Sequence, residues 1–161
     1  MARWKEYKLK EVCSRLKSGR SIKSEYVTKK GTYPVIGGNG IRGYTEYSNF
    51  VGSCGIIGRQ GAYCGNTRFF NGEAYITEHA IVVIGNELAD TYFLTSLLSL
   101  MHLGTLSAQS AQPGISVHTL AEQNVCLPDI KYQIYVSDIL RTLDSKIELN
   151  RRINGNLKIV A

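Results

Sequence analysis

TYPVIGGNGIRGYTEY, residues 32–47, decides between two fold classes for this chain. Residues 38–43 fit G-x-G-x-x-G after an apolar run, which is the pattern of a dinucleotide-binding turn between a strand and a helix. That turn needs a helix beginning at the glycines, and an acidic residue about 20 positions further on that holds the ribose. Here the chain continues as YTEYSNFVGSCG without helical periodicity. The residues about 20 positions further on, GAY at 61–63, include no acidic side chain. We therefore predict a strand that ends in a tight glycine loop, and not a nucleotide-binding fold.

Short runs of β-forming residues surround this loop and are separated by glycine and Asn-Gly. Asn71-Gly72 in particular is a strong signal for a two-residue hairpin turn. We predict a compact, curved β-sheet with long loops. The runs are YPVI at 33–36, GIIGR at 55–59, TRFF at 67–70, AYIT at 74–77 and HAIVVIG at 79–85.

Two helices are predicted after these strands. Residues 90–103, DTYFLTSLLSLMHL, have apolar side chains three and four positions apart, with Asp90 or Thr91 placed as the cap, so they predict a core helix. NVCLP at 124–128 predicts a last short strand, and a helix that could run to the end follows it. The predicted class is α+β, with a globular domain over residues 1–128 and a helical arm over residues 129–161.

The arm carries an apolar heptad seam of the coiled-coil type. Its thirty or so residues would span about 45 Å at 1.5 Å per residue, longer than a small domain needs, which leaves apolar surface for a second helix. Gly155 lowers helix stability by about 1 kcal/mol relative to alanine. The seam residues are Val136, Ile139, Leu143, Lys146, Asn150, Ile153, Leu157 and Val160, with Leu140 and Ile147 widening it.

Composition narrows the function classes. The 161 residues are 43% hydrophobic, enough for one domain with an appendage, and the formal charge of +6 favours a polyanionic partner. The cysteines at 13, 54, 64 and 126 form no C-x-x-C pair, and the histidines add no ligand cluster, so free thiols in a reducing compartment are expected. Neither a signal peptide nor a membrane span is evident, which predicts a cytoplasmic protein without membrane contact.

Catalysis has little support in the residues. An adenine methyltransferase needs an Asn/Asp-Pro-Pro-aromatic loop, whereas the prolines at 34, 113 and 128 are never adjacent. A nuclease needs clustered carboxylates for Mg²⁺, and the acidic residues here stand apart. The sequence therefore favours binding over chemistry.

The order of the segments resembles a known family. Trp4 with KLKEVCSRLKSG, then YPVIGGNGIRGY, IIGRQGAYCGN, SAQPGIS and LPDIKYQIYVSDILRTLDSKIELNRRIN, is similar to the target recognition domain and adjoining helix of a type I restriction-modification specificity subunit. The resemblance implies a module that binds double-stranded DNA and has no activity of its own. It also implies docking to methyltransferase (M) subunits and a restriction (R) subunit. S-adenosylmethionine, ATP and Mg would then belong to those partner subunits, with no cofactor in this chain.

The chain departs from the family in two ways. Full-length members carry two recognition domains and two helical spacers, whereas this chain has one of each, so it is a half-sized subunit or a fragment of a longer one. The arm begins Lys131-Tyr132-Gln133 where the family tends to have an acidic residue before the glutamine, although Asp129 can still cap the helix. One recognition domain would read one half of a bipartite site, so we expect a homodimer, or pairing with a second recognition half, through the arm.

DNA reading needs cations for phosphates and Arg, Asn or Gln for base edges. The predicted loops supply both kinds, including a long uncharged loop at 104–116 and a basic cluster that also contains Lys17. The glycines at 38–43 would allow the backbone to approach a DNA groove closely. The candidate DNA-contact residues are Arg20, Lys23, Lys29, Lys30, Asn39, Arg42, Tyr44, Arg59, Gln60, Tyr63, Asn66, Arg68, Gln109 and Gln112.

Structural roles are the alternative for several of these residues. Arg42 could cap a turn, Arg68 could pair with Glu73 across the Asn-Gly hairpin, and the tyrosines could be half-buried scaffold. His79 is expected to be structural, and His118 is a weaker phosphate candidate. For the whole chain, the alternative functions are a scaffold whose arm binds only protein and a small nucleotide-dependent enzyme built on the glycine loop.

Overall fold

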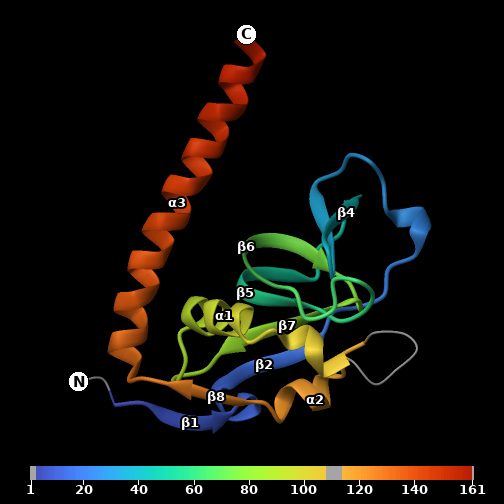
Figure 1. Cartoon of the computed structure of the whole chain (residues 1–161). Helices are drawn as coiled ribbons and strands as arrows, with labels where there is room; N and C mark the ends of the chain where they lie inside the picture. The colour runs from blue at the N-terminus through green and yellow to red at the C-terminus, as the bar shows by residue number, and fades with distance from the viewer. Residues whose placement is uncertain (1–2, 108–113, 161) are drawn as a thin grey trace.

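The computed structural model describes residues 3–107 and 114–160, with side chains described as far as residue 156. It is an α+β domain with a curved sheet and one long C-terminal helix, so the predicted fold class is confirmed (Figure 1). Gln109 and Gln112 lie outside the described residues, as do the side chains of Leu157 and Val160.

Six strands form the main sheet in the order β2-β7-β5-β6-β3-β4. Neighbouring strands are antiparallel except β3 and β6, which are parallel. The strands are β2 (Cys13–Ser18), β3 (Tyr33–Gly37), β4 (Gly40–Thr45), β5 (Phe50–Gly58), β6 (Thr67–Ile76) and β7 (Ala80–Gly85).

A second, two-stranded sheet pairs β1 (Lys5–Lys8) with β8 (Asn124–Leu127) and joins the start of the described chain to the segment that precedes the arm. The predicted last strand at 124–128 is therefore present. Short helical segments connect the strands: η1 (Leu9–Val12), η2 (Ser24–Tyr26), η3 (Leu103–Ser107) and α2 (Val117–Ala121).

Helix α1 (Thr91–Leu100) packs on one face of β5, β6 and β7. Its residues Phe93, Leu94 and Leu98 are buried in the main core. Asp90 caps the helix as predicted, because its side chain accepts a hydrogen bond from the Phe93 amide at 2.9 Å. The apolar positions three and four residues apart thus become the contact between helix and sheet.

The β5–β6 ribbon folds over, and this curvature buries the other face of the sheet. Gly52 and Gly72 lie opposite each other in the ribbon with φ of 117° and 143°, a region that favours glycine. The curl encloses a second apolar cluster that includes Phe50, Ile56 and Ile76. The sheet is therefore covered by α1 on one side and by its own fold on the other.

The hairpin predicted at Asn71-Gly72 is wrong. β6 runs through both residues without a turn, and the pairing with β5 continues from Ser53↔Asn71 to Val51↔Glu73. Ser53 Oγ also donates to Asn71 Oδ1 at 2.8 Å. Cross-strand pairing overrides the local turn preference, so the two predicted runs at 67–70 and 74–77 are one strand with a bend.

The glycine loop forms the turn between β3 and β4. Gly37 pairs with Gly40, and Gly38-Asn39 lie between them at the tip. Gly38 has no room for a side chain, because a Cβ there would lie 2.8 Å from the His79 carbonyl oxygen. A strand follows these glycines and not a helix, so they shape a close contact between loops.

Helix α3 (Ile130–Val160) is the predicted arm, and it stands along one side of the domain with its C-terminal part extending past the sheet (Figure 1). Asp129 caps it, accepting from the Tyr132 amide at 3.0 Å. Of the described helices, including this one, none has both the length and the apolarity to cross a bilayer.

The predicted seam divides between two environments. Val136 packs against the main core of its own domain and Leu140 is half-buried, so these positions are not free for a second helix. Ile139, Leu143, Ile147 and Ile153 are 45–49% exposed and continue the apolar stripe further along the helix. With about 3.6 residues per turn, Leu143 and Ile147 lie on the same side of the helix as Val136, but beyond the part that the domain covers. The arm therefore packs on its own domain at its base and carries uncovered apolar surface beyond it.

Candidate nucleic-acid interface

Loops from distant parts of the chain meet at one end of the curled sheet, which we call the loop end. It comprises residues 19–20, 37–40, 58–68, 76–80 and 114–115. Backbone hydrogen bonds join these loops: Gly19 N donates to Ala80 O at 3.0 Å, Arg20 N to Ile76 O at 3.0 Å, Arg59 N to His79 O at 2.9 Å, and Ile115 N to Arg59 O at 2.8 Å. The predicted contact residues of these loops are therefore neighbours in space.

Gln60 and His79 form a polar pair at the loop end. Gln60 Oε1 lies 2.9 Å from His79 Nδ1, and His79 Nε2 lies 3.4 Å from Glu78 Oε1. Arg59 is half-buried, with Nη1 3.5 Å from the Glu78 carbonyl oxygen. His79 is thus held between two neighbours, as expected of a structural histidine, while Gln60 remains exposed.

Arg68 holds the glycine turn against the sheet. Its Nη2 donates to Gly38 O at 3.2 Å, and a Cβ on Gly40 would lie 2.6 Å from its Nη1. The alternative pairing with Glu73 is wrong, because Glu73 instead accepts from Ser48 Oγ at 2.6 Å. Arg68 thereby fixes the position of the exposed Asn39 at the tip of the turn.

The other predicted basic residues lie along β4 and the 20–31 segment. The Tyr44 backbone exchanges hydrogen bonds with Thr28 at 2.9 Å, which places the exposed Lys29 and Lys30 beside the far end of β4. Lys23 is also exposed and lies 3.6 Å from Glu25. Arg42 lies between the two groups, with its stem against Gly37.

The structure thus brings one set of predicted residues to the loop end and leaves another set further along β4. Tyr63 and Asn66 belong with the loop end, since Gly58 N donates to Asn66 O at 2.8 Å. The loop-end set is Arg20, Asn39, Arg59, Gln60, Tyr63, Asn66 and Arg68, and the β4 set is Lys23, Lys29, Lys30 and Tyr44.

The sequence did not predict the residues that join the arm to the domain. Gln133 is fully buried, and its side chain bonds to three backbone groups: Asp90 N at 3.0 Å, Leu88 O at 2.9 Å and Pro128 O at 2.8 Å. Ser137 Oγ donates to Asp90 Oδ1 at 2.5 Å. The signal available in the sequence was Gln133 itself, a polar residue at a helix position that should face the core.

An aromatic and charged contact follows one turn further along the arm. The Arg141 guanidinium lies over the rings of Tyr92 and Phe69, at 4.7 and 5.6 Å from the ring centroids. Tyr92 Oη donates to Asp144, and burial together with this carboxylate raises the pKa of Tyr92 to about 12. These contacts fix the direction of α3 relative to the domain.

The chemistry available to the site is hydrogen bonding and charge. Over residues 3–107 and 114–160, no three His, Cys, Asp or Glu side chains come together as a metal site would require. Burial raises the pKa of the Cys13 and Cys54 thiols to about 12, so these thiols are unreactive at neutral pH. The loop end is suited to binding a polar, anionic surface.

Residues 1–158 match the family model described as the type I restriction modification DNA specificity domain. The chain is 36% identical over 135 residues to the specificity subunit of the type I restriction enzyme EcoprrI from Escherichia coli, covering 81% of this chain and 34% of that protein. It is 24% identical over 157 residues to a putative type I specificity subunit of Mycoplasma pneumoniae, covering 94% and 42%.

Solved structures share the fold. An S subunit of a type I restriction-modification system from M. genitalium superposes with a TM-score of 0.80 at 18% identity, covering 91% of this chain and 40% of that one. The HsdS subunit from Thermoanaerobacter tengcongensis has a TM-score of 0.65 at 17% identity, covering 92% and 39%. The chain thus spans about two-fifths or less of the length of these relatives.

Proposed function

The chain belongs to the type I restriction-modification DNA specificity family, and from this premise we propose that it reads one half of a bipartite DNA target. In this proposal it delivers the bound DNA to methyltransferase and restriction subunits and performs no chemistry itself. S-adenosylmethionine would be held by the methyltransferase subunits, and ATP and Mg by the partner subunits. The role is recognition, which agrees with the family's description as a specificity domain.

The convergence of the loop end is the observation that carries the proposal. Five loop segments converge there, three of them present arginine, asparagine, glutamine and tyrosine side chains, and β4 leads from there to exposed lysines. Base edges are read by Arg, Asn and Gln, while lysines and arginines position the phosphates. Arg59 and Arg68 are held by neighbouring backbone groups, so they would lose little side-chain freedom on binding DNA.

Binding to duplex DNA tests this proposal against a scaffold that binds only protein. We expect the full chain to bind a fluorescent 30-base-pair duplex with an affinity that falls steeply with salt, the log–log slope being about −0.9 per phosphate contacted. Fluorescence anisotropy at several KCl concentrations measures both quantities. Absence of binding at low salt, with the chain shown to be folded by circular dichroism, would leave the scaffold role.

Arg59→Ala and Arg68→Ala separate DNA contact from support of the loops. We expect each substitution to weaken DNA binding by about ten-fold, the worth of one discriminating contact. Arg68→Ala should in addition lower the melting temperature, because the turn at Gly38 loses its hydrogen bond to β6. Anisotropy measures the loss of DNA affinity, and thermal denaturation measures the loss of stability. Unchanged DNA affinity in both variants, with stability lost as in a core substitution, would make both residues structural.

Pairing of two copies through α3 would complete the bipartite reader. The exposed stripe of α3 extends to Tyr132 and Tyr135, which are 43% and 63% exposed, so it runs from the domain outward. An antiparallel pair relates two identical domains by a two-fold axis, and such a dimer reads a palindromic, interrupted site. We propose this homodimer, with a second recognition half encoded elsewhere as the alternative partner.

The order of side chains along the stripe selects one antiparallel register. With the two-fold axis at Glu148, Leu143 lies opposite Ile153 of the second copy, and Lys146 lies opposite Asn150. Ile147 and Leu149, which are 47% and 49% exposed, then flank the axis, and Ile147 of one copy lies opposite Leu149 of the other. Apolar residues thus pair with apolar ones, and the two polar seam residues pair with each other.

A further inference from the structure

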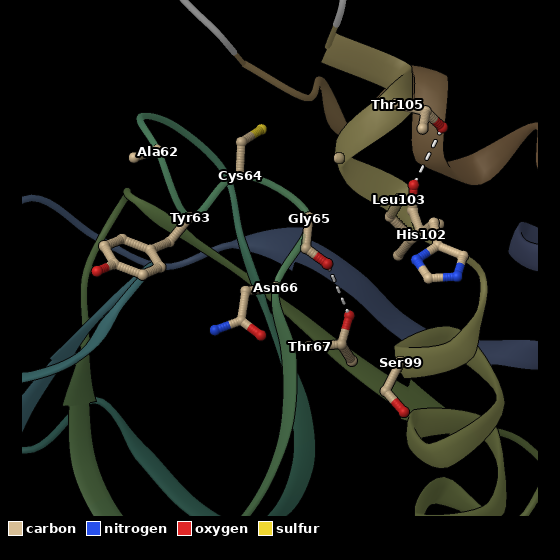
Figure 2. A pocket seen from close by; sticks show the side chains of 11 residues that line it. Ala62, Tyr63, Cys64, Gly65, Asn66, Thr67, Ser99, His102, Leu103 and Thr105 are labelled. Carbon is tan, nitrogen blue, oxygen red and sulfur yellow. Dashed lines mark hydrogen bonds between the residues drawn. The ribbon is translucent and has the colours of Figure 1, made fainter.

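An open cleft of about 460 Å³ lies beside the loop end, between the 61–66 loop and the segment that follows α1 (Figure 2). Tyr63 and Asn66 border it on one side, and Ser99, His102 and Thr105 on the other. Residues from two segments more than 30 positions apart in sequence, 62–67 and 99–105, therefore line one opening. The residues of the second side, which belong to α1, η3 and the turn between them, were not predicted from the sequence to contact DNA.

The floor of the cleft is a close contact between two backbone segments. A Cβ on Gly65 would lie only 2.1 Å from the Gly104 amide nitrogen, and the φ of Gly65 is +81°. Glycine is therefore required at 65, and the loop that carries Tyr63 and Asn66 is pressed onto η3. The two sides of the cleft are thus fixed relative to each other.

His102 occupies a position at which glycine is the usual residue. It follows the cap residue Met101 with φ of 49°, the only positive φ of a residue other than glycine in the described chain. A residue just after a helix end commonly adopts this left-handed conformation, and glycine does so without steric cost. His102 adopts this conformation despite the steric cost to a residue with a Cβ, and its imidazole is exposed at the cleft.

Three side chains around the opening have hydrogen-bonding groups to offer. Within the described chain, the phenol of Tyr63, the amide of Asn66 and the imidazole of His102 make no hydrogen bond. The neighbouring hydroxyls are already engaged with backbone oxygens: Ser99 with Ser96, Thr105 with His102, and Thr67 with Gly65. The eleven lining residues include no Asp or Glu, so no side-chain carboxylate among them repels an anion.

We propose that this cleft receives a phosphodiester of the bound DNA, with His102 and Asn66 donating to it from opposite sides. The assignment rests on the proposed DNA-reading function and extends the contact surface from the loop end to the end of α1. Neutral donors such as these side chains are common phosphate contacts that position a duplex without reading its sequence. His102 is thus a positioning residue for the reading loops.

His102→Gly tests the proposal without threatening the fold, because glycine relieves the left-handed conformation at this position. We expect the full chain with this substitution to keep or raise its melting temperature. Its affinity for DNA should fall about five-fold, as expected for the loss of one hydrogen bond. His102→Asn, which tolerates the same backbone conformation and keeps a donor, should retain more of the affinity than His102→Gly.

The probes are two 30-base-pair duplexes of unrelated sequence, each titrated by anisotropy. A phosphate contact predicts the same fold-loss on both duplexes, whereas a loss on one alone would assign a base contact and overturn the proposal. Affinity of His102→Gly within two-fold of the parent would also overturn it and leave the proposed DNA-reading function intact. Asn124→Ala, at an exposed position on β8, is the control and should change neither affinity. Failure of the parent chain to bind either duplex would overturn both proposals.

Discussion

Gln133→Ala should lower the free energy of unfolding by about 3 kcal/mol, because it leaves three backbone groups, one buried and two partly buried, without this partner. The side chain is 0% exposed and bonds to Asp90 N, Leu88 O and Pro128 O within 3.0 Å. These groups belong to the segment before α1 and to the segment before α3. The substitution therefore weakens the contact between the arm and the domain and also creates a cavity.

Urea denaturation followed by circular dichroism measures this effect. Lys131→Ala, two positions earlier on the exposed side of the same helix, is the matched control and should change stability by less than about 0.5 kcal/mol. Gln133→Glu should also destabilise, since a carboxylate cannot donate to the two carbonyl oxygens. A loss below about 1 kcal/mol in Gln133→Ala would mean that water or a shifted α3 satisfies the three groups.

Leu143→Asp should abolish self-association of the chain. We expect the parent to be a dimer, and the carboxylate to raise the dimer dissociation constant by at least about 100-fold, since each copy would bury an unpaired charge in the apolar stripe. Ile153→Asp should act alike, because Leu143 and Ile153 of opposite copies meet in the proposed register. Sedimentation over a concentration series measures the effect. Ser145→Asp, at a position outside the stripe, is the control and should leave the dimer dissociation constant unchanged.

Cross-linking tests the register itself. In a Cys126→Ser background, which removes the exposed thiol, Ile147→Cys should link to its own counterpart with a short bifunctional thiol reagent. Ile153→Cys should not, because antiparallel pairing separates the two copies of residue 153 by about 15 Å along the axis. The reverse result would indicate a parallel pair. A monomer at all concentrations, unaffected by Leu143→Asp, would leave a methyltransferase subunit or a second recognition half as the partner of α3.

Several local elements were predictable because their signals lie within a few residues. Asp90 and Asp129 cap helices that begin where the apolar periodicity begins. The glycines at 38–43 failed the nucleotide-binding pattern because no helical periodicity follows them, and the structure has a strand at Gly40–Thr45. In each case a short stretch contains all the physics that decides the outcome.

Local signals failed where a distant segment changed the balance. Asn71-Gly72 has strong turn preference, yet eight consecutive residue pairs with β5 keep β6 extended through it. Arg68 stood near Glu73 in sequence but donates to Gly38, which another part of the chain brings alongside. Val136 belonged to the predicted seam, and the domain core covers it instead.

The sequence by itself determined the α+β class, strands β3, β5, β7 and β8, the two longer helices and the polar character of the loops, since composition and periodicity fix which residues seek burial and at what spacing. Only the tertiary structure decided which loops meet at one end of the sheet, that His102 faces Asn66 across a cleft, and that Gln133 joins the arm to the domain. These contacts join residues far apart in the chain, such as Gly19 and Ala80 at the loop end. They depend on the curl of the β5–β6 ribbon and on the packing of α1 against α3, which no short stretch of residues encodes.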